Sequence, residues 1–320
     1  MGVEKAFDDF QTVVNADKDR VDLARQRRDT FKKAFKDEPD VEEVFGSGSL
    51  ARSTQLDPVH DVDLVVVYRA DDHPDWGQPG ESANDALAYT RGRVKYLLGV
   101  TDGTVDQLIR HTLLRDRAVK CFIDPPDFQD AFTVDAMPVL RQADGTLLIP
   151  SRRSQSWSTA DPEYLIAVVA DRQREWQHFR AMVRVLKRWR LSVPTKVKSL
   201  VMEVLALQCM PRSGTRPEAL RAFFTAAAIQ INWGIYDPAG HCGPIQPDLD
   251  ISVLREELEK ARDAATRACA LHADGDSDEA QRAWQDVLGP DFPAPKKKVS
   301  PAITGPALIT GRPIRDAPQG

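Results

Sequence analysis

The sequence has few cysteines and no long apolar run. Its four cysteines, Cys121, Cys209, Cys242 and Cys269, lie far apart with no Cys-x-x-Cys spacing, which argues against a zinc ribbon or a disulfide framework. The longest apolar runs, such as DLVVVY, are far shorter than the roughly 18 to 20 residues that cross a bilayer. The acidic start MGVEKAFDDF does not resemble a secretory signal. We therefore expect a cytoplasmic protein with no membrane partner.

An excess of basic charge is also absent. The 43 Lys and Arg residues face 48 Asp and Glu residues, giving a net charge of −5, which argues against a dedicated partner of long nucleic acid. Hydrophobic residues make up 42% and charged residues 28% of the 320 positions, as in an ordinary globular protein of one large domain or two packed ones. The net charge does not argue against a small anionic ligand, because basic clusters such as RQRR at 25–28 could hold phosphates.

The residue patterns divide the chain into three parts. Residues 3–35 lack Gly and Pro and place apolar residues at helical spacing, which predicts one long helix that acts as a spine. Between about 41 and 148, β-branched runs flank a helical stretch at 84–98, and from about 162 helical patterns dominate. We expect an α+β fold: a mixed-sheet lobe with the N-terminal spine helix over 1–160, a helical lobe over 161–293, and a flexible Pro/Gly-rich tail over 294–320.

Three carboxylates mark a candidate metal site. Asp61 and Asp63 open the run DVDLVVVY, and a period of two puts both side chains on one face of a strand, where they can share a hard cation. Asp135 lies in the second run FTVDAMPVL, where its charge is costly unless it is paired or bound to metal. Three carboxylates from two neighbouring strands suit two-metal phosphoryl transfer, with Mg²⁺ as the expected ion and Mn²⁺ as a substitute.

A phosphate-binding turn precedes the carboxylates. The stretch FGSGSLARST combines small residues with a short helix-compatible segment. Its backbone N–H groups around Gly48, and the hydroxyls of Ser47 and Ser49, can bind a triphosphate. The spacing therefore predicts a phosphate cradle directly upstream of the metal ligands.

These motifs together resemble a known family. The GS-LARST turn, the DVD triplet twelve residues after Ser49, and the VD before an apolar-Pro pair are similar to the DNA polymerase beta-like nucleotidyltransferases. More narrowly, the chain resembles the bacterial cGAS/DncV-like nucleotidyltransferases (CD-NTases) of anti-phage CBASS-type signalling, with the 2′,5′-oligoadenylate synthetases as more distant relatives. The helical segments VRVLKRWR and VKSLVMEVL and the closing AWQDVLGPDFP extend the resemblance over about residues 40–293.

The resemblance implies further nucleotide-binding residues. Lys187 of VRVLKRWR corresponds to the lysine that reaches the nucleotide phosphates, and Lys198 and Ser199 face the same pocket. Arg52 belongs to the turn, where the family's Arg-Gly-Thr is Arg52-Ser53-Thr54 in this chain. Because most L-residues disfavour positive φ, we expect Ser53 to avoid it and the turn to differ slightly.

The resemblance also implies an activity. In it, Asp61 and Asp63 hold both metal ions and Asp135 holds the one that acidifies an acceptor hydroxyl. The product is a cyclic or short linear oligonucleotide second messenger, made from NTPs with release of pyrophosphate, that activates a downstream effector. The alternatives are a nucleotidyltransferase that modifies a tRNA or a protein, and a catalytically silent nucleotide-binding sensor. The tail ending in Gly320 is either a disordered terminus or a site for conjugation by a ubiquitin-transfer-like partner.

Some of these residues also have simpler interpretations. A lone Asp-x-Asp is more often a solvated turn than a metal site, and the basic helix around Lys187 is, without the family, a solvated face. His241 and Cys242 find no further donors at metal-binding spacing, so we interpret them as structural.

Overall fold

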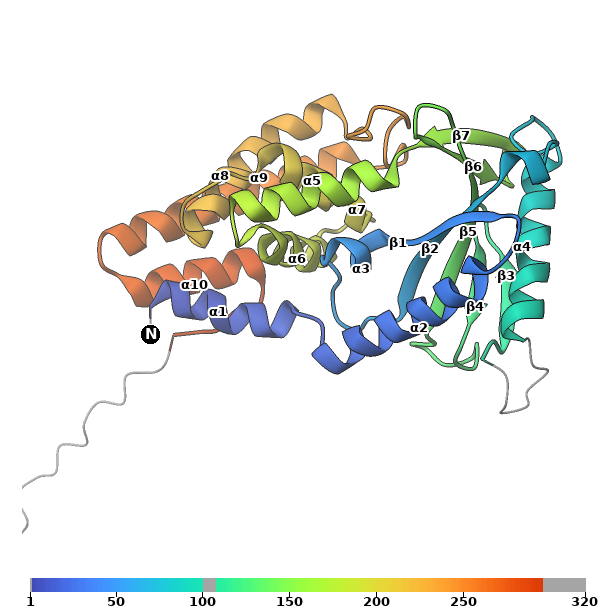
Figure 1. The fold of residues 1–320 in the computed structure, drawn as a ribbon. Helices are drawn as coiled ribbons and strands as arrows, with labels where there is room; N and C mark the ends of the chain where they lie inside the picture. Colours follow the sequence, from blue (N-terminus) through green and yellow to red (C-terminus); the bar gives the residue numbers. More distant parts are fainter. Residues whose placement is uncertain (1, 100–107, 296–320) are drawn as a thin grey trace, which may run out of the picture.

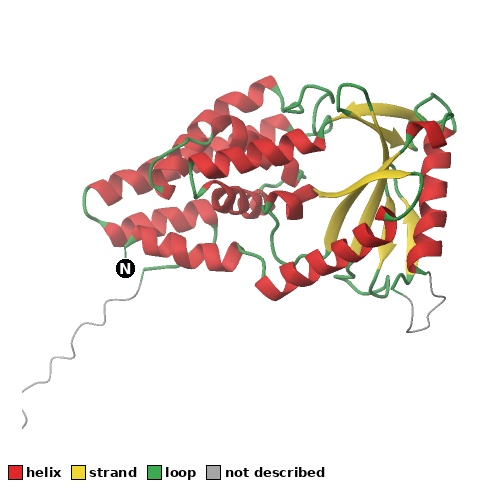
Figure 2. Cartoon of the chain, viewed as in Figure 1, coloured by secondary structure: helices red, strands yellow, loops and turns green. Residues whose placement is uncertain are grey.

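The computed structural model describes residues 2–99 and 108–295. Figure 1 shows two lobes: a twisted sheet with its helices on the right, and a bundle of helices on the left. Strands are confined to the first lobe, whereas helices occur in both (Figure 2). The α+β fold with a mixed sheet and a helical lobe, expected from the sequence, is confirmed.

The first half of the chain contains both helices and strands, and the second half contains helices without strands in its described part. In chain order they are α1 (Val3–Val14), α2 (Lys18–Lys36), β1 (Val41–Ser47), α3 (Gly48–Arg52), β2 (Asp61–Tyr68), α4 (Ser82–Leu98), β3 (His111–Leu114), β4 (Val119–Phe122), β5 (Thr133–Arg141), β6 (Leu147–Ser151), β7 (Ser156–Ala160), α5 (Pro162–Glu175), α6 (Phe179–Trp189), α7 (Ser199–Cys209), α8 (Arg216–Gln230), α9 (Ile251–Ala273) and α10 (Ser277–Leu288). None of the described helices is long and apolar enough to cross a membrane.

The expected single spine helix is two helices. Asp17 caps α2 by accepting a hydrogen bond from the backbone N–H of Arg20, and Asn15 leaves the helix to form an isolated β-bridge with Leu56. A side-chain cap of this kind competes with continued helix, which explains the break. The apolar positions were predicted correctly, but they serve two cores: α1 packs in the helical lobe and α2 in the sheet lobe.

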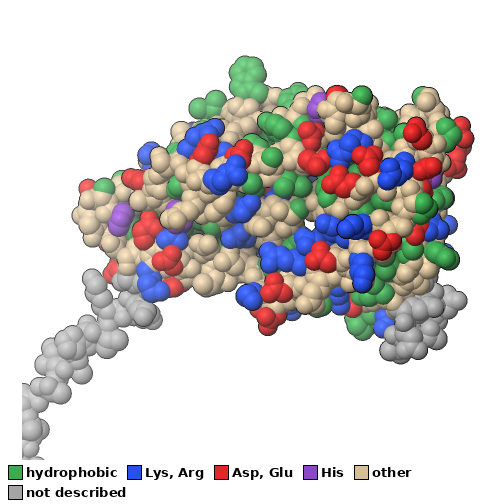
Figure 3. Space-filling view, viewed as in Figure 1, with side chains coloured by type: hydrophobic (Ala, Val, Ile, Leu, Met, Phe, Trp, Pro, Cys, Tyr) green, Lys and Arg blue, Asp and Glu red, His purple; other side chains and the backbone are tan. Residues whose placement is uncertain are grey.

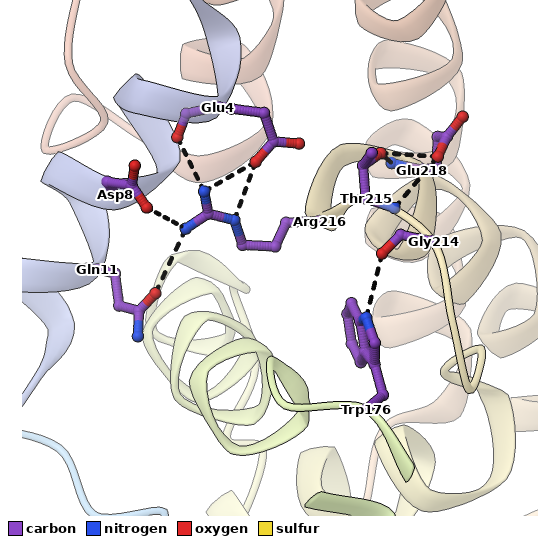
Figure 4. Close-up of polar contacts among 8 residues, drawn as sticks. All are labelled: Glu4, Asp8, Gln11, Trp176, Gly214, Thr215, Arg216 and Glu218. Carbon is purple, nitrogen blue, oxygen red and sulfur yellow. Dashed lines mark hydrogen bonds and ion pairs between the residues drawn. The ribbon is translucent and has the colours of Figure 1, made fainter.

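A buried arginine fixes α1 to the helical lobe. Arg216, at the start of α8, donates to the carboxylate and the carbonyl of Glu4 and to Gln11, and pairs with Asp8 at 2.7 Å. Figure 4 shows this guanidinium pointing from α8 into the facing turns of α1. The first helix thus belongs by its contacts to the second lobe, whereas we had expected the whole N-terminal region to accompany the sheet.

The sheet has one face covered by helices and one face open to the site. Its strands run in the order β1-β2-β5-β4-β3, with β6 on β5 and β7 on β6, and only β2 and β5 are parallel. Alternate residues of β2, including Val62 and Leu64, pack under α2 and α4 in one core. Asp61 and Asp63 therefore project from the opposite face, as their spacing predicts.

Candidate active site

Four side chains form a row across the open face of the sheet. The strand register pairs Ser47 of β1 with Asp63 of β2, Asp63 with Asp135 of β5, and Asp135 with Lys120 of β4. Directly paired residues share a face, so a hydroxyl, two carboxylates and an ammonium project side by side. Asp61 lies on the same face, two residues before Asp63. The structure thus brings the three predicted carboxylates to one face of two adjacent strands.

Three members of the row, Ser47, Asp63 and Asp135, line a cavity of about 770 Å³ between the sheet and the helical lobe. Its lining combines the turn, both strands, the β3–β4 turn, the start of α5 and the loop before α9. Among the residues predicted from the sequence, the lining contains Ser47, Gly48, Arg52, Asp63, Asp135 and Lys198. Within the described ranges, Asp61, Ser49, Lys187 and Ser199 are not among the lining residues.

The carboxylates in this cavity hold protons unusually well. Desolvation, followed by repulsion from Asp61 and Asp135, raises the pKa of Asp63 to about 6, although Arg52 and Lys120 oppose the shift. Desolvation also raises the pKa of Asp135, and Lys120 again counteracts it. Asp63 still touches solvent because the cavity is open. Neighbouring carboxylates in such surroundings favour a bound cation.

The donor set fits a hard divalent cation. Oδ1 of Asp135 is buried and has no hydrogen-bond partner, and an unpaired buried carboxylate oxygen is costly unless something positive binds it. Oxygen donors are also what Mg²⁺ and Mn²⁺ prefer. Among the described residues, however, no three acidic, His or Cys side chains already converge as a metal-binding group.

Gly48 closes the turn against Asp63. Its φ is +68°, and a Cβ at this position would lie 1.7 Å from Oδ2 of Asp63, so the backbone needs both the conformation and the space of glycine. Five residues on, Ser53 has φ +57° and ψ +40°. Our expectation that serine would avoid the left-handed region here is wrong. Its backbone carbonyl accepts a 2.7 Å hydrogen bond from Arg184, one of the contacts that hold the strained residue in place.

A buried ion cluster joins this turn to the helical lobe. Glu203 of α7 is fully buried and accepts from Nε of Arg52 at 2.6 Å and from the Thr54 hydroxyl at 3.2 Å. Nζ of Lys187 lies 2.7 Å from the same carboxylate and also donates to the carbonyl and the hydroxyl of Thr54. Burial alone would raise the pKa of Glu203, but Lys187 and Arg52 outweigh it and lower that pKa.

Lys120 and Glu203 were not predicted from the sequence as residues of this site. Lys120 lies in the run AVKCFI, and its place beside Asp135 depends on the β4–β5 register, which no local pattern reveals. Glu203 is the one charged residue of the α7 segment SLVMEVLALQC, and a lone charge in an apolar helix is a signal for a buried partner. Cys242 was interpreted as structural and lines the cavity, with its thiol donating to the carbonyl of Thr159.

Replacing Gly48 by alanine should damage both the turn and the position of Asp63. The added Cβ clashes with the carboxylate, and a left-handed alanine costs about 1–2 kcal/mol. We expect Gly48→Ala to lower the free energy of unfolding in urea by at least that amount. Gly92→Ala is the matched control, because this α4 glycine has no neighbour within 4 Å of an added Cβ and should gain roughly 0.5–1 kcal/mol. Equal stability of Gly48→Ala and wild type would contradict the described contact.

Removing the charge of Glu203 should be strongly destabilising. Glu203→Gln leaves Lys187 and Arg52 buried without a counter-ion, so we expect a loss of about 3 kcal/mol or more. Adding Lys187→Met should restore part of it, because one uncompensated cation is then gone. Glu259→Gln, at an exposed pair with Arg255, should stay within about 0.5 kcal/mol. Urea unfolding of the four proteins measures this, and a Glu203→Gln loss as small as that of Glu259→Gln would refute the role of the cluster.

Comparison with known proteins places this geometry among related chains. No protein-family model matches the sequence. A curated Bacillus cereus (strain VD146) protein, named as a probable cyclic nucleotide synthase, is 24% identical over an alignment of 345 positions, which covers 90% of this chain and 97% of that protein.

Solved CD-NTase structures share the fold. CdnC of Escherichia coli MS115-1, solved with ATP, superposes with a TM-score of 0.69 at 20% identity over 91% of this chain and 99% of CdnC. The same protein in complex with HORMA-deltaN gives a TM-score of 0.67. The CD-NTase CdnG of Bradyrhizobium diazoefficiens, in complex with GTP, gives 0.64 at 10% identity over 89% of this chain and 94% of CdnG. The chain therefore has the fold of these CD-NTases, as the resemblance of its motifs to that family implies.

Proposed function

We propose that the protein is a metal-dependent nucleotidyltransferase that joins NTPs into a cyclic or short linear oligonucleotide and releases pyrophosphate. The observation that carries the proposal is the parallel register of β2 and β5, which sets Asp63 beside Asp135 on the wall of a cavity. The cavity also contains the Ser47–Gly48 turn, so potential metal ligands and phosphate-binding groups adjoin each other.

The activities of similar proteins support this proposal. The Bacillus cereus relative is named for cyclic nucleotide synthesis. CdnC was solved with ATP, and Vibrio cholerae DncV, described as a cyclic AMP-GMP synthase, was solved with the linear intermediate pppA(3′,5′)pG at a TM-score of 0.56. A cyclic dinucleotide synthase that was solved with a linear intermediate thus has a similar fold, which supports the joining of nucleotides by this chain.

The residues of this chain have separate tasks in the reaction. Asp61, Asp63 and Asp135 would hold two divalent cations, which would neutralise phosphate charge and make the acceptor hydroxyl more acidic. Ser47 and the backbone of Gly48 hold the triphosphate of the donor NTP. The acceptor ribose hydroxyl loses its proton to solvent and attacks the α-phosphate in line. A new phosphorus–oxygen bond to the ribose forms as the bond between the α-phosphorus and the bridging oxygen breaks, and pyrophosphate leaves.

Two of the basic residues face the cavity, and a third is buried behind it. Arg52 and Lys198 line the cavity and contribute positive charge toward the phosphates. Lys187 is committed to Thr54 and Glu203, so it positions the turn rather than touching the nucleotide. Ser199 is the first residue of α7 and follows Lys198 directly.

We further propose a cellular role in CBASS-type anti-phage signalling, in the cytoplasm, with an effector that responds to the product. The complex of CdnC with HORMA-deltaN makes a regulatory protein partner a reasonable extension to this chain. Conjugation through Gly320 stays a hypothesis about a residue outside the described ranges.

The direct test is product formation from NTPs alone. Purified protein with labelled NTPs and Mg²⁺ or Mn²⁺ should form phosphatase-resistant small products. Asp63→Asn and Asp135→Asn should each lower the rate roughly 100-fold or more, because charge neutralisation at the reacting phosphate is lost. Asp127→Asn, at an exposed loop position, is the control and should keep full activity.

Other outcomes of this assay would favour the other functions. Label that appears only on added tRNA or protein would indicate macromolecule modification. Nucleotide binding without turnover under all NTP mixtures would indicate a silent sensor. Unchanged synthesis by Asp63→Asn and Asp135→Asn would refute the assignment of the site.

The raised pKa of Asp63 predicts a pH-dependent stability of the metal-free protein. An acid whose pKa rises on folding, here from 3.8 to about 6, stabilises the fold while protonated and loses that contribution as pH rises from about 4 to 6. In EDTA, Asp63→Asn should therefore gain Tm relative to wild type at pH 8, by roughly 2 °C or more, and about half as much at pH 5. Mn²⁺ should raise the Tm of wild type at pH 8 but not that of Asp63→Asn. A loss of stability in Asp63→Asn that is equal at both pH values would contradict this account.

A further inference from the structure

A second hollow adjoins the main cavity. It has a volume of about 570 Å³ and is lined by Leu114, Arg115, Asp116, Arg152 and Arg153. Arg115 and Asp116 line the main cavity as well, so the two spaces meet at the turn between β3 and β4. The β3–β4 turn is therefore a wall common to both spaces.

One aspartate holds the walls of the hollow together. The β3–β4 turn is closed by a 2.8 Å hydrogen bond from Arg115 to the carbonyl of Ala118. The carbonyl of Asp116 accepts from the backbone N–H of Arg152 at 2.8 Å, and its carboxylate accepts from the backbone N–H of Arg153 at 2.7 Å. The same carboxylate accepts from the Ser151 hydroxyl at 3.1 Å. Two separate hairpins thus present their arginines at one place.

These arginines are exposed and lack acidic partners. In the described part of the chain, none of Arg115, Arg117, Arg152 and Arg153 forms an ion pair within 4 Å. Other arginines, such as Arg141, hold several carboxylates. The Asp116 carboxylate offsets one charge of the four, so an acidic protein accumulates positive charge at this point. Like charges gathered in this way favour a bound anion.

We propose that this arginine cluster, Arg115, Arg117, Arg152 and Arg153, binds the 5′-triphosphate of the acceptor nucleotide. The proposal rests on the proposed function and makes the acceptor a free nucleoside triphosphate. Four guanidinium groups match the roughly four negative charges of a triphosphate. Arg115 is also close enough to Asp135 to act on its charge, so the cluster begins beside the reacting centre. The acceptor sugar then lies in the main cavity, where its hydroxyl faces the carboxylates.

The surroundings favour a single nucleotide over a nucleic acid chain. A nucleic acid needs basic side chains along a track, whereas basic and acidic side chains are interspersed over the face drawn in Figure 3. The net charge of −5 also disfavours a long polyanion. The cluster is local, and its hollow shares the β3–β4 turn with the cavity.

The test compares acceptors with and without a triphosphate. Arg152→Gln/Arg153→Gln is the variant, and Arg69→Gln/Arg91→Gln, at positions away from both hollows, is the control. With a labelled NTP donor, each nucleoside triphosphate and its matching nucleoside are offered as acceptors. The variant should use the triphosphate acceptor at least about 10-fold less efficiently, because two charge-assisted contacts are lost. Its use of the nucleoside should be unchanged.

The other results of this assay overturn the proposal. An equal loss with both acceptors would mean that the arginines only support the fold of the site. Undiminished use of the triphosphate acceptor by the variant would place its phosphates elsewhere, and labelling of added RNA in preference to any NTP would identify a nucleic acid acceptor.

A binding measurement separates this proposal from the proposed function. In EDTA, inorganic triphosphate should raise the Tm of wild type and of the control more than that of Arg152→Gln/Arg153→Gln, which keeps only the donor-triphosphate turn. An equal shift in all three proteins would refute the anion subsite even if the enzyme is active. If the variant responds less than wild type and the control, the subsite stands even if no turnover is found.

Discussion

The parallel register of β2 against β5 is the constraint on which the site depends. It is fixed from the other side of the sheet, where Val62, Leu64 and Val66 are at most 1% exposed. Burying such side chains contributes roughly 1.5–3 kcal/mol each, and a slip of one residue would turn all of them toward the cavity. The repulsion between Asp63 and Asp135 is weaker than this, since both face a solvent-open cavity. The apolar core therefore holds the two carboxylates side by side. Their mutual repulsion in the cavity favours the binding of a cation.

One buried carboxylate, that of Glu203, connects the turn after Gly48 to the helical lobe. Glu203 holds Arg52 from the sheet lobe and Lys187 from the helical lobe, and it is the desolvated partner of both. Leaving either cation unpaired would lower the free energy of unfolding by several kcal/mol. The two ion pairs therefore fix the position of the sheet lobe relative to the helical lobe at this point. The cavity lies where they meet, with Arg52 in its wall. Packing on one side and ion pairing on the other thus determine its shape.

Local patterns predicted the parts of this arrangement that depend on local physics. The alternation in DVDLVVVY gave the face of Asp61 and Asp63, and the small residues of GSGS gave the turn around Gly48. The break at Asp17 was missed because helical spacing of apolar residues continues across it, although they serve two different cores. Lys120 and Glu203 could not be assigned roles, because their partners are set by strand pairing and by contact between lobes. Ser53 shows the converse: its intrinsic preference is overridden by the contacts around it.

The contacts of Lys187 decide between a direct and an indirect role in phosphate binding. An ammonium group has three donors, and here Thr54 accepts two hydrogen bonds through its carbonyl and hydroxyl while Glu203 forms the third contact. Reaching a nucleotide would break these contacts and strand the Glu203 carboxylate in a fully buried position. Hydrogen bonds to charged groups contribute about 1.5–3 kcal/mol each, so one phosphate contact does not offset three losses. We therefore propose that Lys187 acts through Thr54 and Glu203, and that groups which already face the cavities bind the phosphates.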